Sequence, residues 1–62
     1  MNIQVITEQP HSLVTLTYKN SLTAPIVQET DDNGSVFFND VAGSHTITTN
    51  DKIISTITEI VD

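Results

Sequence analysis

The sequence predicts an all-β protein, a small antiparallel β-sandwich of six to seven strands, from three observations. Valine, isoleucine and threonine supply 24 of the 62 residues, whereas alanine appears twice and leucine three times. Such β-branched side chains suit a pleated strand better than a helix. In SLVTLTY, Val14, Leu16 and Tyr18 alternate with threonine, as expected for a strand with one face on the core. Turn signals recur about every 8 to 12 residues, which is typical of sandwiches and barrels.

The expected strands lie between successive turn signals. These signals are EQPHS around Pro10, KNS around Asn20, TDDNGS, VAGSH around Gly43, and TNDK. Glycine, proline, asparagine and aspartate each favour turn conformations for a specific stereochemical reason. The expected strands therefore cover residues 2–7, 12–19, 24–30, 35–39, 44–50 and 52–60.

The last expected strand has a competing interpretation. Its apolar positions have helical spacing, and Asp51 can cap a helix. Five of the six residues from 53 to 58 are β-branched, which favours a strand. We expect a strand at 52–60 and keep a short helix as the alternative.

The length of the chain indicates a single domain, residues 1–62. A chain this short buries only about 60% of the surface that its unfolded form exposes, so its independent stability is marginal. It has no cysteine, which excludes a disulfide or a thiolate metal site. We therefore expect the domain to be stabilised by good β packing or by another protein chain.

The charge of the chain limits its partners. Eight acids face two lysines, and the net charge is −6. Almost nothing can neutralise phosphates, so the sequence predicts no binding to nucleic acid or to anionic membranes. No apolar run approaches the roughly 18 residues that cross a bilayer. The first residues lack the parts of a secretory signal, so we expect no signal peptide and synthesis in a host cytoplasm.

The stretch TDDNGSVFFNDVAGSHTI, residues 30–47, resembles the prealbumin-like β-sandwich group. That group includes carboxypeptidase regulatory-like domains and the B-type repeats of collagen-binding adhesins. Its pattern is a Thr-Asp turn closed by glycine, a strand, a small loop ending in glycine, and an aromatic strand. The chain departs from it in a second loop that is one residue short and in His45, which replaces the expected tyrosine. The resemblance implies an Ig-like or prealbumin-like sandwich, a fold that carries many functions.

The turns of this motif single out three structural residues. Asp31 can accept hydrogen bonds from backbone amides across the turn. Gly34 can adopt a positive φ at a position where a β-carbon would clash, and Gly43 serves the same need at the next reversal. We therefore predict that Asp31, Gly34 and Gly43 are turn-structural residues.

Two adjacent phenylalanines, Phe37 and Phe38, must face opposite ways in a strand. The family pattern places Val36 and Phe38 inward, which points Phe37 outward. Covering an exposed phenylalanine contributes about 1.5–3 kcal/mol of hydrophobic free energy, although isolated apolar residues on a surface are also ordinary. We predict that Phe37 is a protein-interface residue.

No residue set indicates catalysis or a cofactor. His11, expected in a loop, and His45, expected in a core or half-buried position, lack a nucleophile elbow or an oxyanion loop. The run from Asp31 to Gly34 lacks the alternating acids and distal glutamate of a calcium loop. The sequence therefore predicts a non-enzymatic protein with no cofactor and no metal.

The adhesin relatives suggest an isopeptide bond between a lysine and an asparagine, promoted by a buried acid. Lys19, Glu29 and Asn50 are the candidates, but their positions do not match the family's motif. The relatives carry the lysine in the first strand, where this chain has none.

The sequence is most typical of a structural or interaction module that docks on a larger assembly. It resembles small Ig-like or prealbumin-like proteins that decorate or cement bacteriophage capsids, or that act as tail accessories. This predicts a location in the virion, as a homo-oligomer or docked on a partner. Two alternatives remain: an acidic, DNA-mimicking phage inhibitor of a host nuclease or regulator, and a fragment of an adhesin-like surface protein.

Overall fold

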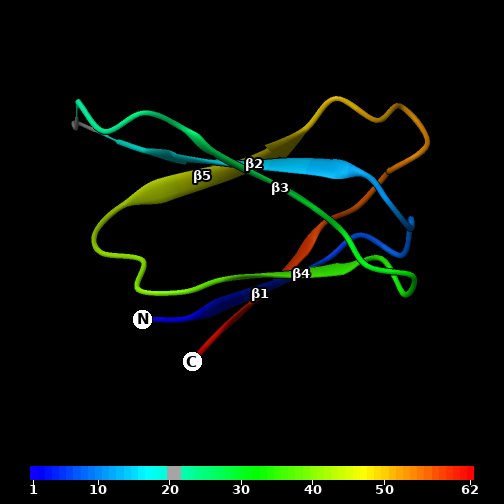
Figure 1. The fold of residues 1–62 in the computed structure, drawn as a ribbon, viewed down its shortest axis with the longest axis horizontal. Helices are drawn as coiled ribbons and strands as arrows, with labels where there is room; N and C mark the ends of the chain where they lie inside the picture. The colour runs from blue at the N-terminus through cyan, green and yellow to red at the C-terminus, as the bar shows by residue number, and fades with distance from the viewer. Residues whose placement is uncertain (20–21) are drawn as a thin grey trace.

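The computed structural model describes residues 1–19 and 22–62, which form six strands and no helix. The strands are β1 (Ile3–Ile6), β2 (Leu13–Tyr18), β3 (Ile26–Glu29), β4 (Ser35–Phe38), β5 (His45–Thr49) and β6 (Thr58–Val61). They form two three-stranded antiparallel sheets with the orders β4-β1-β6 and β3-β2-β5 (Figure 1). The predicted all-β sandwich is therefore confirmed. None of the described segments forms an apolar helix long enough to cross a bilayer.

β1 and β2 are the central strands of the two sheets, and the chain passes between the sheets several times. β2 and β3 are consecutive strands of one sheet, whereas the other successive strands alternate between the sheets. Backbone hydrogen bonds between Asn2 and Asp62, at 3.2 and 2.9 Å, extend the β1–β6 pairing to the chain ends. The two ends therefore lie side by side at one end of the sandwich (Figure 1).

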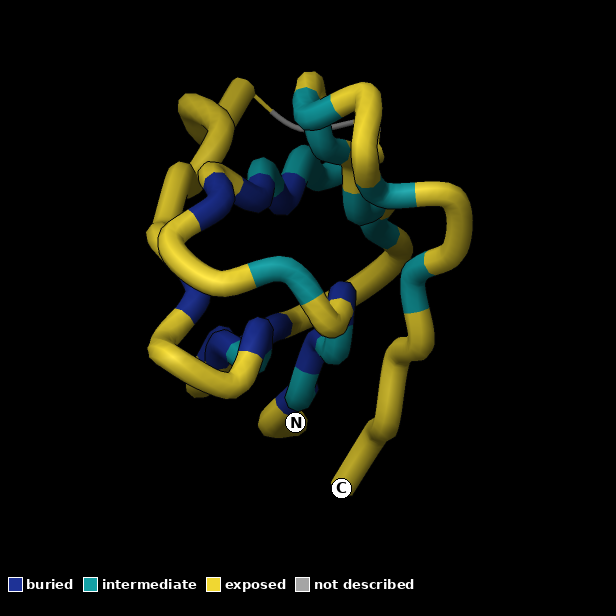
Figure 2. Tube along the Cα trace, turned by 90° about the vertical axis from the view of Figure 1, so that its right-hand side faces the viewer, coloured by how far each residue is buried: buried dark blue, intermediate teal, exposed yellow. Residues whose placement is uncertain are grey.

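The hydrophobic core lies between the two sheets. Its central strands alternate buried side chains with more exposed ones, which confirms the period predicted for Val14 and Leu16. The buried apolar residues are Ile3, Val5, Val14, Leu16, Val36, Phe38 and Val41. Figure 2 shows buried segments in both layers, while the segment leading to the C-terminus is largely exposed. The edge strands β3 and β6 therefore contribute little to the core.

The expected strand at 52–60 is wrong over most of its length, and so is the alternative helix. β6 begins only at Thr58. Asp51 Oδ1 accepts a hydrogen bond from the Ile53 amide at 2.9 Å, and the Asp51 carbonyl accepts one from Ile54 at 3.2 Å. Asp51 thus caps a single turn that does not continue, in a segment whose β-branched residues disfavour a helix.

The other five expected strands agree with the structure to within two residues at either end. The turn expected around Asn20 lies outside the described residues.

Candidate interaction surface

Strand β4 places two adjacent phenylalanines on opposite faces of its sheet. Phe38 is 1% exposed and belongs to the core, whereas Phe37 is 55% exposed. The difference follows from the two-residue period of a strand, since Val36 and Phe38 share the inner face. The expected outward orientation of Phe37 is confirmed, and its role in binding stays a prediction.

The outer face of sheet β4-β1-β6 carries a row of three side chains, Phe37, Gln4 and Ile60, which we call the outer row. Gln4 on β1 is registered opposite Phe37 on one side and opposite Ile60 on the other. Side chains opposed in this way lie about 4.5–5.5 Å apart at their β-carbons. Ile60 is 47% exposed. An apolar side chain therefore flanks Gln4 on each side, open to solvent.

A hollow of about 240 Å³ adjoins the outer row. It is lined by Asn2, Gln4, Phe37, Asn39, Ile60 and Asp62. Gln4 Nε2 donates a hydrogen bond to Ser35 Oγ at 2.9 Å, which orients the amide of Gln4 within the row. Asn2 Oδ1 accepts one from the Asp40 amide at 3.1 Å. Amides and a carboxylate thus supply the polar wall of the hollow.

The opposite face of the sandwich has an apolar pair of its own, Leu13 on β2 and Val27 on β3. They are 59% and 54% exposed, and they line a hollow of about 410 Å³ together with polar residues of the neighbouring loops. No phenylalanine, tyrosine or tryptophan is among the residues that line this hollow. Aromatic side chains bury the largest apolar area at interfaces, so the outer row is the stronger candidate.

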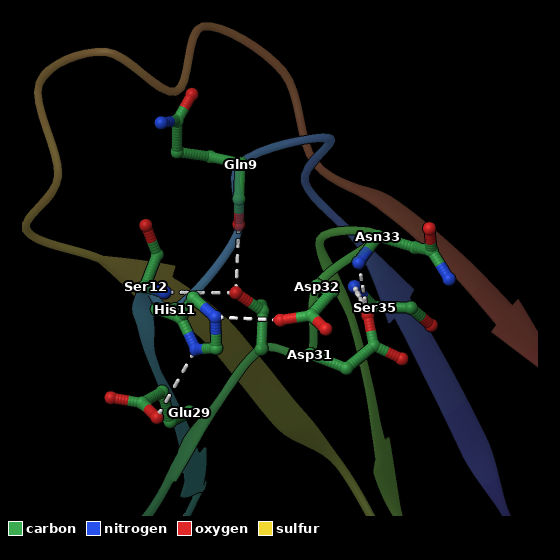
Figure 3. Close-up of polar contacts among 9 residues, drawn as sticks. Gln9, His11, Ser12, Glu29, Asp31, Asp32, Asn33 and Ser35 are labelled. Atoms are coloured by element: carbon green, nitrogen blue, oxygen red, sulfur yellow. Dashed lines mark hydrogen bonds and ion pairs between the residues drawn. The ribbon is translucent and has the colours of Figure 1, made fainter.

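The turn at residues 30–35 is built by Asp31 and Gly34. Asp31 Oδ1 accepts hydrogen bonds from the backbone amides of Ser35, at 3.0 Å, and Asn33, at 2.8 Å (Figure 3). These bonds, that of Ser35 first, lower the pKa of Asp31. Gly34 has a φ of 78°, and a β-carbon there would lie 2.5 Å from the backbone nitrogen of Gln9. The hydrogen bonds expected of Asp31 and the positive φ and close approach expected of Gly34 are thus present.

Gly43 also has a positive φ, of 91°, as predicted for the second reversal. A β-carbon at Gly43 would meet no heavy atom within 4 Å. The clash expected of a β-carbon at Gly43 is therefore wrong, and glycine is favoured here by the backbone conformation alone.

Thr30 ties this turn to the loop between β1 and β2. Its hydroxyl accepts a hydrogen bond from the Ser12 amide at 2.8 Å and donates one to the Gln9 carbonyl at 2.7 Å (Figure 3). Thr30 is 2% exposed. Among residues 1–19 and 22–62, no buried side-chain nitrogen or oxygen lacks a partner. The role of this hydroxyl was not predicted from the sequence, although Thr30 opens the turn motif.

Most of the acids at this end of the sandwich engage neighbouring groups. Asp51 Oδ2 accepts a hydrogen bond from Ser12 Oγ at 2.6 Å, which is the main cause of its lowered pKa. His11 Nε2 lies 2.7 Å from Asp32 Oδ1, and its Nδ1 lies 3.6 Å from Glu29 Oε1 (Figure 3). These carboxylates therefore bind groups within the protein's own loops. Phosphate mimicry instead requires a continuous stripe of carboxylates that are available to a partner.

His45 on β5 faces Glu59 on β6 between the two sheets. Their side chains are 12% and 34% exposed. His45 Nε2 bonds to Glu59 Oε1, and its Nδ1 lies 3.2 Å from the carbonyl oxygen of Gly43. The bond to Glu59 is the main cause of the raised pKa of His45, while nearby Lys19 opposes it. The predicted half-buried position of His45 is confirmed, but the pairing with Glu59 was not foreseen.

The histidines do not form a catalytic triad. A triad needs one ring nitrogen facing a hydroxyl and the other facing a carboxylate. In His11 both ring nitrogens face carboxylates, and in His45 they face a carboxylate and a backbone carbonyl. In the described part of the chain, no group of three or more histidine, aspartate or glutamate side chains is placed to hold a metal ion. The absence of enzymatic activity stays a prediction.

The isopeptide hypothesis is wrong on the register of the strands. Glu29 pairs with Leu13 at the start of β2, and the β5 strand that precedes Asn50 pairs Thr49 with Val14. Lys19 follows the other end of β2, where its amide donates to the Ser44 carbonyl. The lysine therefore lies a whole strand length away from the other two candidates.

No family model, curated protein or solved structure matches the chain. The class of the protein is therefore defined by its fold, a small sandwich of two antiparallel three-stranded sheets, and by the exposed outer row on one of them.

Proposed function

We propose that the protein is a non-enzymatic interaction module that docks on a larger protein assembly through the outer row. The observation that supports it is the alignment of Phe37 and Ile60, 55% and 47% exposed, on either side of Gln4. Exposed apolar side chains that gather on one face mark interaction sites more often than scattered ones do. Burying a phenylalanine at such a site contributes about 1.5–3 kcal/mol.

The backbone pairing of the sheet favours this use of the outer row. Phe37 and Ile60 lie on the two strands that flank β1, and all three positions are held by antiparallel pairing. A partner therefore meets side chains whose backbone positions are already fixed, which lowers the entropic cost of binding.

In its specific form, the proposal is a prealbumin-like or Ig-like decoration protein of a bacteriophage capsid, or a tail accessory protein. The turn motif at residues 30–47 and the small size of the domain support this form. A domain with so small a core gains stability from the surface of a partner. The protein then acts in the virion, either docked singly or as a symmetric oligomer.

Sedimentation of the tagged protein from its native lysate tests the proposal, because it separates large particles from soluble complexes. We expect the wild-type protein to sediment with particles in a fixed ratio and Phe37→Ser to remain largely in the supernatant. Val27→Ser is the matched control, since Val27 is exposed to 54% on the opposite sheet. We expect this control to sediment like the wild type.

Two results would contradict the proposal. Sedimentation of Phe37→Ser at the wild-type level would exclude the outer row as the docking site. Recovery of the wild-type protein only in a soluble complex with one basic protein, lost as salt rises, would favour the acidic inhibitor instead.

A further inference from the structure

We propose that the hollow beside the outer row binds an arginine side chain of the partner protein. The guanidinium group lies at Asp62, and the aliphatic stem packs between Phe37 and Ile60. This inference rests on the proposed function and deepens it, since it gives the chemistry of the partner at the same site.

The hollow beside the outer row has both apolar and polar walls. Phe37 and Ile60 provide apolar sides. Asp62 contributes a carboxylate, and Asn2 and Asn39 contribute amides. Gln4 Nε2 donates one of its two hydrogens to Ser35 Oγ, and the Gln4 carbonyl oxygen is the acceptor that this amide offers to a ligand. A ligand that matches both kinds of wall needs an apolar stem and a group rich in hydrogen-bond donors.

Arginine has this combination. Its three methylenes pack along apolar surface while its head stays polar. Its planar guanidinium offers five donors, binds carboxylates through two parallel hydrogen bonds, and stacks on aromatic faces. A volume of about 240 Å³ accommodates one long side chain but not a folded element. A purely apolar ligand would cover the Asp62 carboxylate and the Gln4 carbonyl oxygen without offering either a donor, which is costly.

The charges of the chain favour a basic partner and exclude a second copy as the source of the arginine. The net charge is −6, and the chain's only basic side chains besides histidine are Lys19 and Lys52. Neither of these lysines lines the hollow. The chain has no arginine, so the ligand comes from a different protein.

Titration of ¹⁵N-labelled protein with N-acetyl-arginine amide, followed by NMR, tests the inference. We expect saturable shifts centred on the Gln4 side-chain amide and on the backbone amides of Phe37 and Ile60. N-acetyl-lysine amide is expected to bind several-fold more weakly, because its ammonium neither stacks nor forms two parallel hydrogen bonds. Asp62→Asn is expected to weaken arginine binding by about tenfold or more, because the amide has no charge and only one acceptor oxygen for the guanidinium.

The matched control is Asp32→Asn, which removes an exposed carboxylate in the turn that follows β3. We expect this variant to bind arginine like the wild type. Shifts that do not saturate, that centre on Glu29 and Asp32, or that are insensitive to Asp62→Asn would overturn the inference.

The two proposals can fail separately. If Phe37→Ser abolishes sedimentation but arginine does not bind, the docking function stands and the arginine inference is wrong. If arginine binds in the hollow but Phe37→Ser sediments normally, the docking function is wrong while the affinity of the hollow for arginine stands.

Discussion

His45 on β5 and Glu59 on β6 form a polar contact that joins the two sheets between their edge strands. The imidazole bonds to the carboxylate through Nε2, with side chains that are 12% and 34% exposed. β6 is otherwise held by its pairing with β1, and all four of its residues are exposed. The contact therefore helps to keep a weakly packed edge strand closed against the opposite sheet.

This contact predicts a decrease in stability as pH rises through the neutral range. The bond to Glu59 raises the folded-state pKa of His45 above its usual 6.5. Because the folded state binds the His45 proton more tightly than the unfolded state does, this proton stabilises the fold. The stabilisation is fully present below pH 6.5 and is lost as pH rises through the folded-state pKa. Lys19, the other charged group that acts on His45, opposes the shift. Because Glu59 is a third exposed, water screens the pair, and we expect no more than about 1 kcal/mol.

Urea unfolding between pH 5.5 and 8.5 measures this effect. All proteins carry His11→Gln, so that His45 is the only imidazole that titrates. In this background we expect the free energy of unfolding to fall as pH rises. When His45→Gln or Glu59→Gln is added, we expect the free energy of unfolding to stay nearly constant with pH. The lowered pKa values of Asp31 and Asp51 act in another window, since their contributions are lost only below about pH 4. Equal slopes with and without Glu59→Gln would show that the contact does not contribute.

The two turn glycines are predicted to differ in their tolerance of alanine. Both have positive φ values, which cost a residue with a β-carbon about 1–2 kcal/mol. At Gly34 the β-carbon would also lie 2.5 to 2.7 Å from backbone atoms of Glu8 and Gln9, so the backbone must shift. At Gly43 the space is open. We expect Gly43→Ala to cost about 1 kcal/mol and Gly34→Ala to cost about 3 kcal/mol or more.

Chemical denaturation of the two alanine variants checks this order, with Gly43→Ala as the matched control for backbone strain alone. Equal losses in the free energy of unfolding would show that the loop at residues 8–9 moves away from Gly34 without cost.

The adjacent phenylalanines are predicted to have opposite sensitivities to truncation. Phe38 is 1% exposed in the core, and replacing a buried phenylalanine by alanine costs about 3–5 kcal/mol. Phe37 is 55% exposed, and surface substitutions usually change stability by about 0.5 kcal/mol or less. We therefore expect Phe37→Ala to fold normally and Phe38→Ala to lose most of its folded population.

A ¹⁵N–¹H correlation spectrum of each variant is a direct check, because dispersed amide shifts report a folded β protein. A well-dispersed spectrum for Phe38→Ala, or a collapsed one for Phe37→Ala, would contradict the assignment of the two faces.

The fold could be predicted because local and global preferences agree along most of the chain. In β2 the β-branched content, the alternation of Val14 and Leu16 with threonine, and the bounding turns all indicate a strand with one buried face. The Asp31–Gly34 turn could likewise be predicted, since its chemistry is local to a few residues. Phe37 could be placed outward once Phe38 was placed inward, because a strand has a period of two.

The segment after Asp51 could not be predicted, because its local preferences conflict. Isoleucines with helical spacing favour one structure and β-branched residues favour another, and the chain forms one turn followed by a late strand. Because of this error, the position of Ile60 in the outer row was not predicted, since it depends on the register of β6 that places Ile60 opposite Gln4. The contact between His45 and Glu59 was not predicted for the same reason. Contacts between distant strands depend on register, which no local pattern specifies.

Thr30 is predicted to stabilise the loop end of the sandwich through its hydroxyl rather than through its methyl group. The buried hydroxyl bonds to the Ser12 amide and the Gln9 carbonyl, while the backbone of Thr30 also bonds to that of His11 and Ser12. Thr30→Val keeps the shape but leaves the amide and the carbonyl without this partner, which costs about 1–3 kcal/mol.

Thr30→Ser is the matched control, since it keeps the hydroxyl and removes one methyl group, a loss of about 0.8 kcal/mol. We expect Thr30→Val to lower the free energy of unfolding more than Thr30→Ser does. We also expect faster hydrogen exchange at the Ser12 amide in the valine variant, because its acceptor is gone. If serine proved the more damaging of the two and Ser12 exchange stayed slow in the valine variant, packing of the methyl group would be the dominant role of Thr30. The loop between β1 and β2 would then be held mainly by the backbone bonds of Thr30.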